Sequence, residues 1–132
     1  MKKFIFIMNH PANTAQVEAA EKDGHKVIEL TSEQKKLLTV PEDPNLGFDW
    51  FYNRSTEILA AVGGVKLGDI VHVMGQQQLA SAVSALARRF GAQLLESVTP
   101  RISKDFPQPD GSVKKENVFL FSGFRVVHNY ER

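Results

Sequence analysis

The chain has 132 residues, a length that suits one domain with a single hydrophobic core of moderate size. Its net charge of +1 argues against a long basic groove for nucleic acid and against attraction to an anionic membrane surface. The absence of cysteine excludes disulfides, thiolate metal sites and cysteine nucleophiles. The apolar run 4–8 is too short for a signal-peptide core, and no run is long enough to span a membrane, so we expect a cytoplasmic protein.

Strands and helices are predicted to alternate up to residue 97. The continuous apolar run 4–8 is typical of a strand buried on both faces. Asn13 or Thr14 can then cap a helix that runs to residue 23, and Gly24 ends it. The later predicted elements are a strand over 25–30, a short helix from 31 through 38, a loop over 41–47, a helix from 48 to about 62, a strand over 70–74, a helix over 76–90 and a strand over 92–97.

The pattern changes after residue 97, where helical periodicity disappears. The stretch 107–112 is rich in Pro, Asp and Gly and is a strong turn signal between β-rich segments. We therefore expect a β-hairpin that leaves the sheet and a chain that then returns to the sheet edge. The whole chain, 1–132, is predicted to be one Rossmann-like α/β domain, with a mainly parallel sheet flanked by helices and a C-terminal β-hairpin.

The first candidate ligand site is the passage from the strand at 70–74 into the helix at 76–90. Gly75 would let a ligand approach the backbone, and the free N–H groups of the first helical turn favour an anion such as phosphate. Gln76, Gln77 and Gln78 add uncharged amide groups that suit a base edge or a sugar hydroxyl. An ordinary strand-to-helix turn with polar residues explains the same pattern, so both interpretations stay open.

Polar residues also follow two other predicted strands. Asn9 and His10 come directly after the first strand, where His10 suits acid–base chemistry and Asn9 can orient a phosphate or ribose. Thr99 and Arg101 follow the strand at 92–97, and the planar guanidinium group matches phosphate oxygens. Lys104 is a nearby cation, although a solvated lysine on a hairpin is the more ordinary role. Each of these residues can also be a plain turn residue.

Two residues inside predicted strands have polar side chains that need partners. Arg125 lies in an apolar strand and predicts either a ligand contact or an ion pair. His72 lies between Val71 and Val73 and is predicted to be an interior histidine with satisfied hydrogen bonds. The four histidines show no metal-ligand spacing, so we expect neither a metal site nor a cofactor.

Several short motifs occur in a distinctive order along the chain. They are the polar turn at 7–10, a Gly-Asp strand that ends in Gly and enters a helix at 68–79, the Thr-Pro-Arg turn at 99–101, Asp-Gly-Ser-Val-Lys-Lys at 110–115 and Phe-Arg-Val at 124–126. This order resembles the small stand-alone CRISPR-associated ring nucleases, which share the CARF-type Rossmann-like fold. The chain departs from them at 76–78, where three glutamines replace an acidic residue and small residues.

The resemblance implies a homodimer that binds and cleaves cyclic oligoadenylate, above all cyclic tetra-adenylate, and so switches off type III CRISPR signalling. It implies a metal-independent reaction in which a ribose 2′-hydroxyl attacks its own neighbouring phosphate. The candidates for catalysis are then Asn9, His10, Arg101 and Lys104, and those for ligand binding are Gly75, Gln76, Gln77, Gln78, Thr99 and Arg125. The alternatives are a non-catalytic nucleotide sensor and a structural subunit of a larger assembly.

Overall fold

A five-stranded sheet in the order β2-β1-β3-β4-β7 organises the chain. The computed structural model describes residues 1–130. The strands of this sheet are β1 (Lys3–Ile7), β2 (Lys26–Glu29), β3 (Ile70–Val73), β4 (Gln93–Val98) and β7 (Gly123–Val126). The first four run parallel and β7 is antiparallel to β4, which confirms the predicted α/β class with a mainly parallel sheet.

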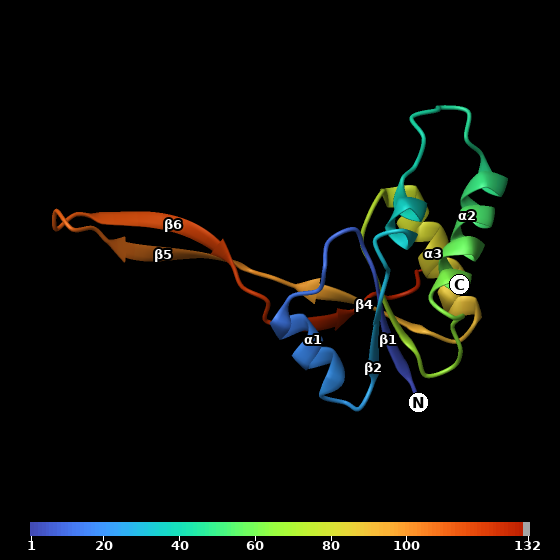
Figure 1. The fold of residues 1–132 in the computed structure, drawn as a ribbon, viewed down its shortest axis with the longest axis horizontal. Helices are drawn as coiled ribbons and strands as arrows, with labels where there is room; N and C mark the ends of the chain where they lie inside the picture. The colour runs from blue at the N-terminus through green and yellow to red at the C-terminus, as the bar shows by residue number, and fades with distance from the viewer. Residues whose placement is uncertain (131–132) are drawn as a thin grey trace.

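Helices cover both faces of the sheet (Figure 1). Because successive strand residues point to opposite faces, β1 is buried on both sides. Phe4 and Phe6 pack with Ala20 of α1 (Thr14–Glu21), whereas the opposite face packs against α2 (Phe48–Ala61) and α3 (Gln77–Arg89). Within residues 1–130, no helix combines the length and apolar character needed to cross a membrane.

The helix boundaries follow the capping residues closely. Asn13 is the N-cap of α1, as predicted, and its side chain accepts a hydrogen bond from the backbone N–H of Gln16. The helix ends at residue 21, two residues before the predicted end. The predicted short helix is a 3-10 helix, η1 (Gln34–Leu38), and reciprocal hydrogen bonds between Thr31 and Gln34 stabilise the turn that precedes it.

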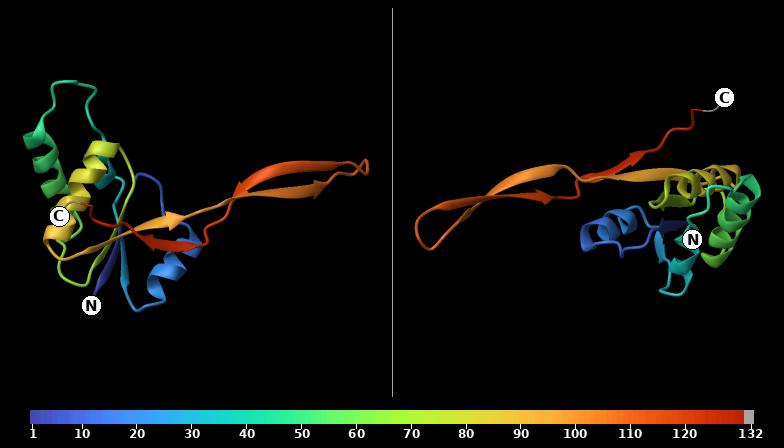
Figure 2. Two further views of the ribbon diagram at one scale, coloured as in Figure 1. Left: turned by 180° about the vertical axis from the view of Figure 1, so that it is seen from behind. Right: turned by 90° about the horizontal axis from the view of Figure 1, so that it is seen from above.

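A second, two-stranded sheet forms the predicted hairpin. It consists of β5 (Arg101–Pro107) and β6 (Val113–Phe119), and it projects away from the body of the domain (Figures 1 and 2). All of its strand residues except Val118 are exposed. After the hairpin the chain returns to the sheet as β7, which confirms the predicted return to the sheet edge.

The strand order creates a switch point between β1 and β3. From β1 the chain passes through α1 to β2 on one side, and from β3 it passes through α3 to β4 on the other side. The connections that follow the two strands therefore diverge at their carboxyl ends. In open α/β sheets this divergence leaves a crevice in which ligands commonly bind.

Candidate functional site

A hollow of about 620 Å³ opens at this switch point. It is lined by residues from the turn after β1, the start of α1, the ends of β3 and β4, and β6: His10, Pro11, Asn13, Gln16, His72, Val73, Met74, Glu96, Ser97, Thr99 and Phe119. No Lys or Arg belongs to this lining. In the described part of the chain, no group of three His, Asp or Glu side chains is placed to hold a metal ion.

The amide of Gln16 connects the cap of α1 to strand β4. Asn13 Oδ1 accepts from the backbone N–H of Gln16 at 2.8 Å, and Gln16 Oε1 accepts from the backbone N–H of Asn13 at 3.0 Å. This reciprocal capping box fixes which end of the amide faces the cap. The nitrogen, Nε2, therefore faces the other way and donates to Ser97 Oγ at 3.0 Å.

His72 of β3 extends this hydrogen-bonded chain into the core. Its Nε2 lies 2.7 Å from Ser97 Oγ, and its ring packs against the rings of Phe6 and Phe124. The side chain is only 1% exposed, and burial lowers the pKa of His72 below its usual value of 6.5. Its Nδ1 atom has no hydrogen-bond partner among the described residues. The predicted interior position of His72 is confirmed, but the residue also lines the hollow.

Two of the predicted site residues line the hollow. His10 is exposed in the turn after β1, with its Nδ1 atom 3.3 Å from the carbonyl oxygen of Pro11. Thr99 follows β4 and is exposed on the same lining. Asn9 is also exposed beside His10, but it is not among the lining residues. The sheet thus brings together His10 and Thr99, which are far apart in the sequence.

The turn after β3, residues 75–78, does not line this hollow. Gly75 is exposed in the turn with a φ of +154°, and Gln76 caps α3 by accepting from the backbone N–H of Leu79 at 2.9 Å. Gln76 and Gln78 line a different hollow of about 350 Å³, together with the loop at 40–46. That loop contributes Glu42 and Asp43 to the lining, so this second hollow is a poor place for a phosphate.

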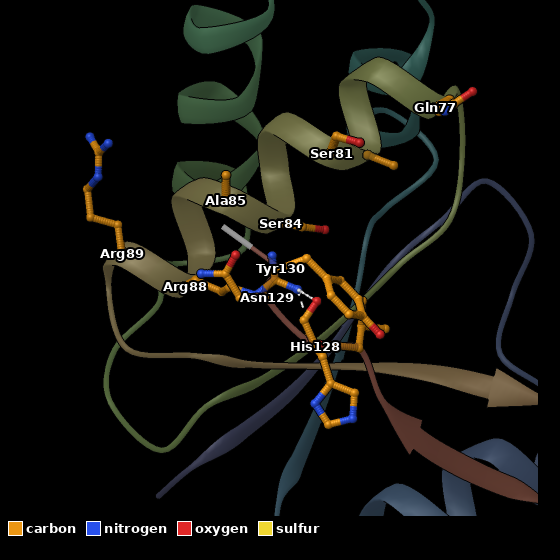
Figure 3. A pocket seen from close by; sticks show the side chains of 11 residues that line it. Gln77, Ser81, Ser84, Ala85, Arg88, Arg89, His128, Asn129 and Tyr130 are labelled. Carbon is orange, nitrogen blue, oxygen red and sulfur yellow. Dashed lines mark hydrogen bonds between the residues drawn. The ribbon is translucent and has the colours of Figure 1, made fainter. Parts of the chain in front are cut away.

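Gln77 lies in a third place, a groove of about 830 Å³ between α3 and the segment after β7. Gln77 lies at one end of the groove, and Arg88 and Arg89 lie at the other end (Figure 3). The guanidinium of Arg88 donates to the carbonyl oxygens of Val127 at 3.0 Å and His128 at 3.4 Å. These bonds hold the segment after β7 against α3.

The predicted cations lie outside the hollow. Arg101 begins β5 and pairs in register with Phe119, which lines the hollow, so Arg101 lies near its rim. Lys104 lies farther along the projecting hairpin. Arg125 forms an ion pair with Glu96, its neighbour across β4 and β7, with 2.9 Å between Nε and Oε2. This ion pair is one of the two roles that the sequence left open for Arg125.

The sequence analysis missed Ser97 and Gln16. Both carried a usable signal, because Ser97 ends a predicted strand and Gln16 stands three residues after the cap Asn13, in the spacing of a capping box. Their hydrogen bond joins residues 81 positions apart, which no local pattern reveals.

Comparison with protein families gives one result. The sequence matches the Uncharacterized protein MJ1673 family over residues 2–125. The chain belongs to this family. The match to the MJ1673 family includes every residue that lines the hollow at the switch point. The comparison with curated proteins finds no match.

Proposed function

We propose that this MJ1673-family protein binds a cyclic oligoadenylate, specifically cyclic tetra-adenylate, and cleaves it as a cytoplasmic homodimer with a CARF-type Rossmann-like fold. The observation that supports the proposal is the hollow at the switch point between β1 and β3, with His10 at its edge. Open α/β sheets bind nucleotides at such points. The order of motifs along the chain supports the choice of a cyclic oligoadenylate.

The proposed reaction uses the substrate's own hydroxyl group as nucleophile. A ribose 2′-oxygen attacks the adjacent phosphorus, the bond from phosphorus to the 5′-oxygen breaks, and the products are a 2′,3′-cyclic phosphate and a 5′-hydroxyl. The 2′-hydroxyl loses one proton and the 5′-oxygen gains one. In this proposal His10, which lines the hollow, moves this proton, and Asn9, exposed beside it, orients the ribose for in-line attack.

Negative charge develops on the phosphate oxygens during this attack. In this proposal Arg101, at the base of the hairpin beside Phe119, stabilises that charge at the rim, with Lys104 as a second cation on the same strand. A ring with rotational symmetry is held best by a symmetric pair of subunits, which favours a homodimer. Light scattering tests this, and a monomer both with and without ligand contradicts it.

The test is incubation of the protein with cyclic tetra-adenylate in the presence of EDTA. We expect a linear product that ends in a 2′,3′-cyclic phosphate. His10→Ala should lower the single-turnover rate by about 10²- to 10⁴-fold with a nearly unchanged Kd. His128→Ala, which alters an exposed histidine outside the hollow, is the matched control and should retain the parent rate. Loss of activity in EDTA that Mg²⁺ restores would contradict the proposed mechanism.

A non-catalytic sensor is the second candidate function. It is favoured by the absence of Lys and Arg from the lining of the hollow, because a cleaving site needs charge near the phosphate. The same assay separates the two functions. Intact cyclic tetra-adenylate together with a raised melting temperature indicates a sensor, whereas linear product indicates an enzyme.

A further inference from the structure

Ser97 is the centre of the hydrogen-bonded chain that lines the hollow. Its hydroxyl group has one hydrogen to donate and two lone pairs that accept. One lone pair is taken by Gln16, whose amide nitrogen donates to Ser97 Oγ because the capping box holds the amide oxygen. What the hydroxyl hydrogen does then depends on which nitrogen of His72 carries its proton.

The surroundings of His72 favour one tautomer. If Nδ1 carried the proton, the ring would hold a buried N–H donor without a partner, and such donors are rare and costly. If Nε2 carries the proton, it donates to Ser97 Oγ over 2.7 Å, and Nδ1 is left only with an unused lone pair. In this tautomer both lone pairs of Ser97 are occupied. The hydroxyl hydrogen is then free to donate to a ligand.

The lining of the hollow indicates what that ligand is. It contains no Lys or Arg to pair with a phosphate. Its polar groups are amides, hydroxyls, the two histidines and the carboxylate of Glu96, which is already paired with Arg125. Met74, 45% exposed, and Phe119, 67% exposed, contribute apolar surface to the same lining. Amides, hydroxyls and a carboxylate beside apolar and aromatic surface suit a flat nucleobase better than an anion.

We propose that this hollow binds a purine base and that Ser97 donates a hydrogen bond to one of its ring nitrogens. Gln16 and His72 act as positioning residues, because they occupy the lone pairs of Ser97 and so fix it as a donor. The identification of the purine as an adenine of the cyclic ligand rests on the proposed function. The reacting phosphate then lies outside the hollow, towards Arg101 at the rim.

The tautomer is tested on the ligand-free protein. Long-range ¹⁵N–¹H NMR of ¹⁵N-labelled protein distinguishes a protonated from an unprotonated ring nitrogen. We expect His72 to carry its proton on Nε2 at neutral pH. A proton on Nδ1 would mean that Ser97 donates to His72, and it would overturn the proposal without any bearing on ring cleavage.

The ligand is tested with two simple probes, adenosine and inorganic phosphate. Adenosine should shift the NMR signals of Ser97 and His72, and inorganic phosphate should leave them unchanged. Signals that respond to phosphate and not to adenosine would assign the hollow to a phosphate and overturn the proposal. A protein that binds adenosine here but leaves cyclic tetra-adenylate intact would refute only the proposed cleavage.

Substitutions at Ser97 complete the test. Ser97→Ala should weaken the binding of both adenosine and cyclic tetra-adenylate by about two- to tenfold, as expected for one hydrogen bond. Ser97→Thr keeps the hydroxyl group and should restore most of this affinity, and Ser32→Ala, at an exposed serine outside the hollow, should have no effect. If Ser97→Ala binds adenosine as tightly as the parent protein, the proposed role of Ser97 is overturned. If the variant still cleaves cyclic tetra-adenylate, the proposed function stays intact.

Discussion

Acidification is expected to destabilise this protein through His72 in particular. The ring is 1% exposed and packs between Phe6 and Phe124, and burial lowers its pKa below 6.5. An interaction of the ring with the backbone of His72 itself raises the pKa, but by less than burial lowers it. The charged groups that act on the ring have smaller effects: His10 lowers the pKa further and Glu96 raises it. The folded protein therefore holds His72 neutral at a pH at which the unfolded chain begins to take up a proton.

The size and direction of the effect follow from this difference in proton uptake. Above the unfolded pKa both states hold a neutral ring, and His72 makes no pH-dependent contribution. Below it the unfolded state binds more protons, so the free energy of unfolding falls by up to about 1.4 kcal/mol for each pH unit. The fall continues until the pH reaches the lowered pKa of the folded state. Between about pH 7.5 and about pH 5.5, the free energy of unfolding should therefore fall through His72, by at most about 1.4 kcal/mol.

Urea unfolding of the wild type and of His72→Gln at both pH values measures this contribution. Glutamine keeps an amide that can bond to Ser97 but does not titrate in this range, so the contributions of the other histidines cancel in the difference. On acidification the free energy of unfolding of the wild type should fall more than that of the variant, by up to about 1.4 kcal/mol. If the variant does not fold, NMR titration of the wild type should show His72 titrating at a pH below the usual range of histidine. Equal pH dependence of the two proteins, or a His72 titration at its usual pH, would refute the reasoning.

Three further substitutions test the described contacts by chemical unfolding. Gly91→Ala should lower the free energy of unfolding by about 2–4 kcal/mol, because Gly91 has a φ of +99° and a Cβ atom there would lie 2.9 Å from the backbone of Leu67. The control is Gly24→Ala, at a φ of +83° with open space around it, which should lower the free energy of unfolding by only about 1–2 kcal/mol. Equal losses in the two variants would contradict the clash at Gly91. Asp69→Ala should lower the free energy of unfolding by about 2–4 kcal/mol, because this fully buried carboxylate accepts hydrogen bonds from two backbone N–H groups. A loss below about 1 kcal/mol would show that water satisfies these two N–H groups in the variant. Gln76→Ala should cost about 0.5–1 kcal/mol through loss of the α3 cap, and an unchanged stability would show that the cap is solvated without cost.

Most of the sheet was predictable because its signals are local. A short apolar run such as 4–8, bounded by turn residues, marks a strand, and Asn13 marks the start of α1. The alternation of strands and helices then favours parallel pairing with crossover helices. The 3-10 geometry of η1 was not predictable, because the sequence pattern of a single helical turn does not distinguish a 3-10 helix from an α-helix.

The candidate site was predicted less well, for reasons that lie in geometry. Gln76, Gln77 and Gln78 are consecutive, but the first is the cap of α3 and the other two lie on its first turn, where neighbouring residues point in directions about 100° apart. The three side chains therefore line two different hollows, neither of them the one at the switch point. The ion pair of Arg125 depends on the register between β4 and β7, and the role of Ser97 depends on contacts with α1 and β3. Neither is encoded within a short window of sequence.

The position of the hairpin makes the stability of β7 depend on the hairpin itself. Val98 of β4 pairs with Gly123 of β7, so β5 and β6 are an insertion at the end of an antiparallel pair. The bonds from Leu120 N–H to the Pro100 carbonyl and from Ser122 N–H to the Val98 carbonyl close its base. When β5 and β6 are paired, the pairing of β7 with β4 closes a loop of only a few residues. When β5 and β6 separate, the same pairing closes a loop several times longer, and the extra loss of chain entropy costs about 1–2 kcal/mol. An isolated two-stranded ribbon is marginally stable in water, so a molecule that binds the exposed ribbon would stabilise the pairing of β5 with β6. It would thereby also stabilise the pairing of β7 with β4. Phe124 of β7 packs against the ring of His72, so this effect would reach the hollow.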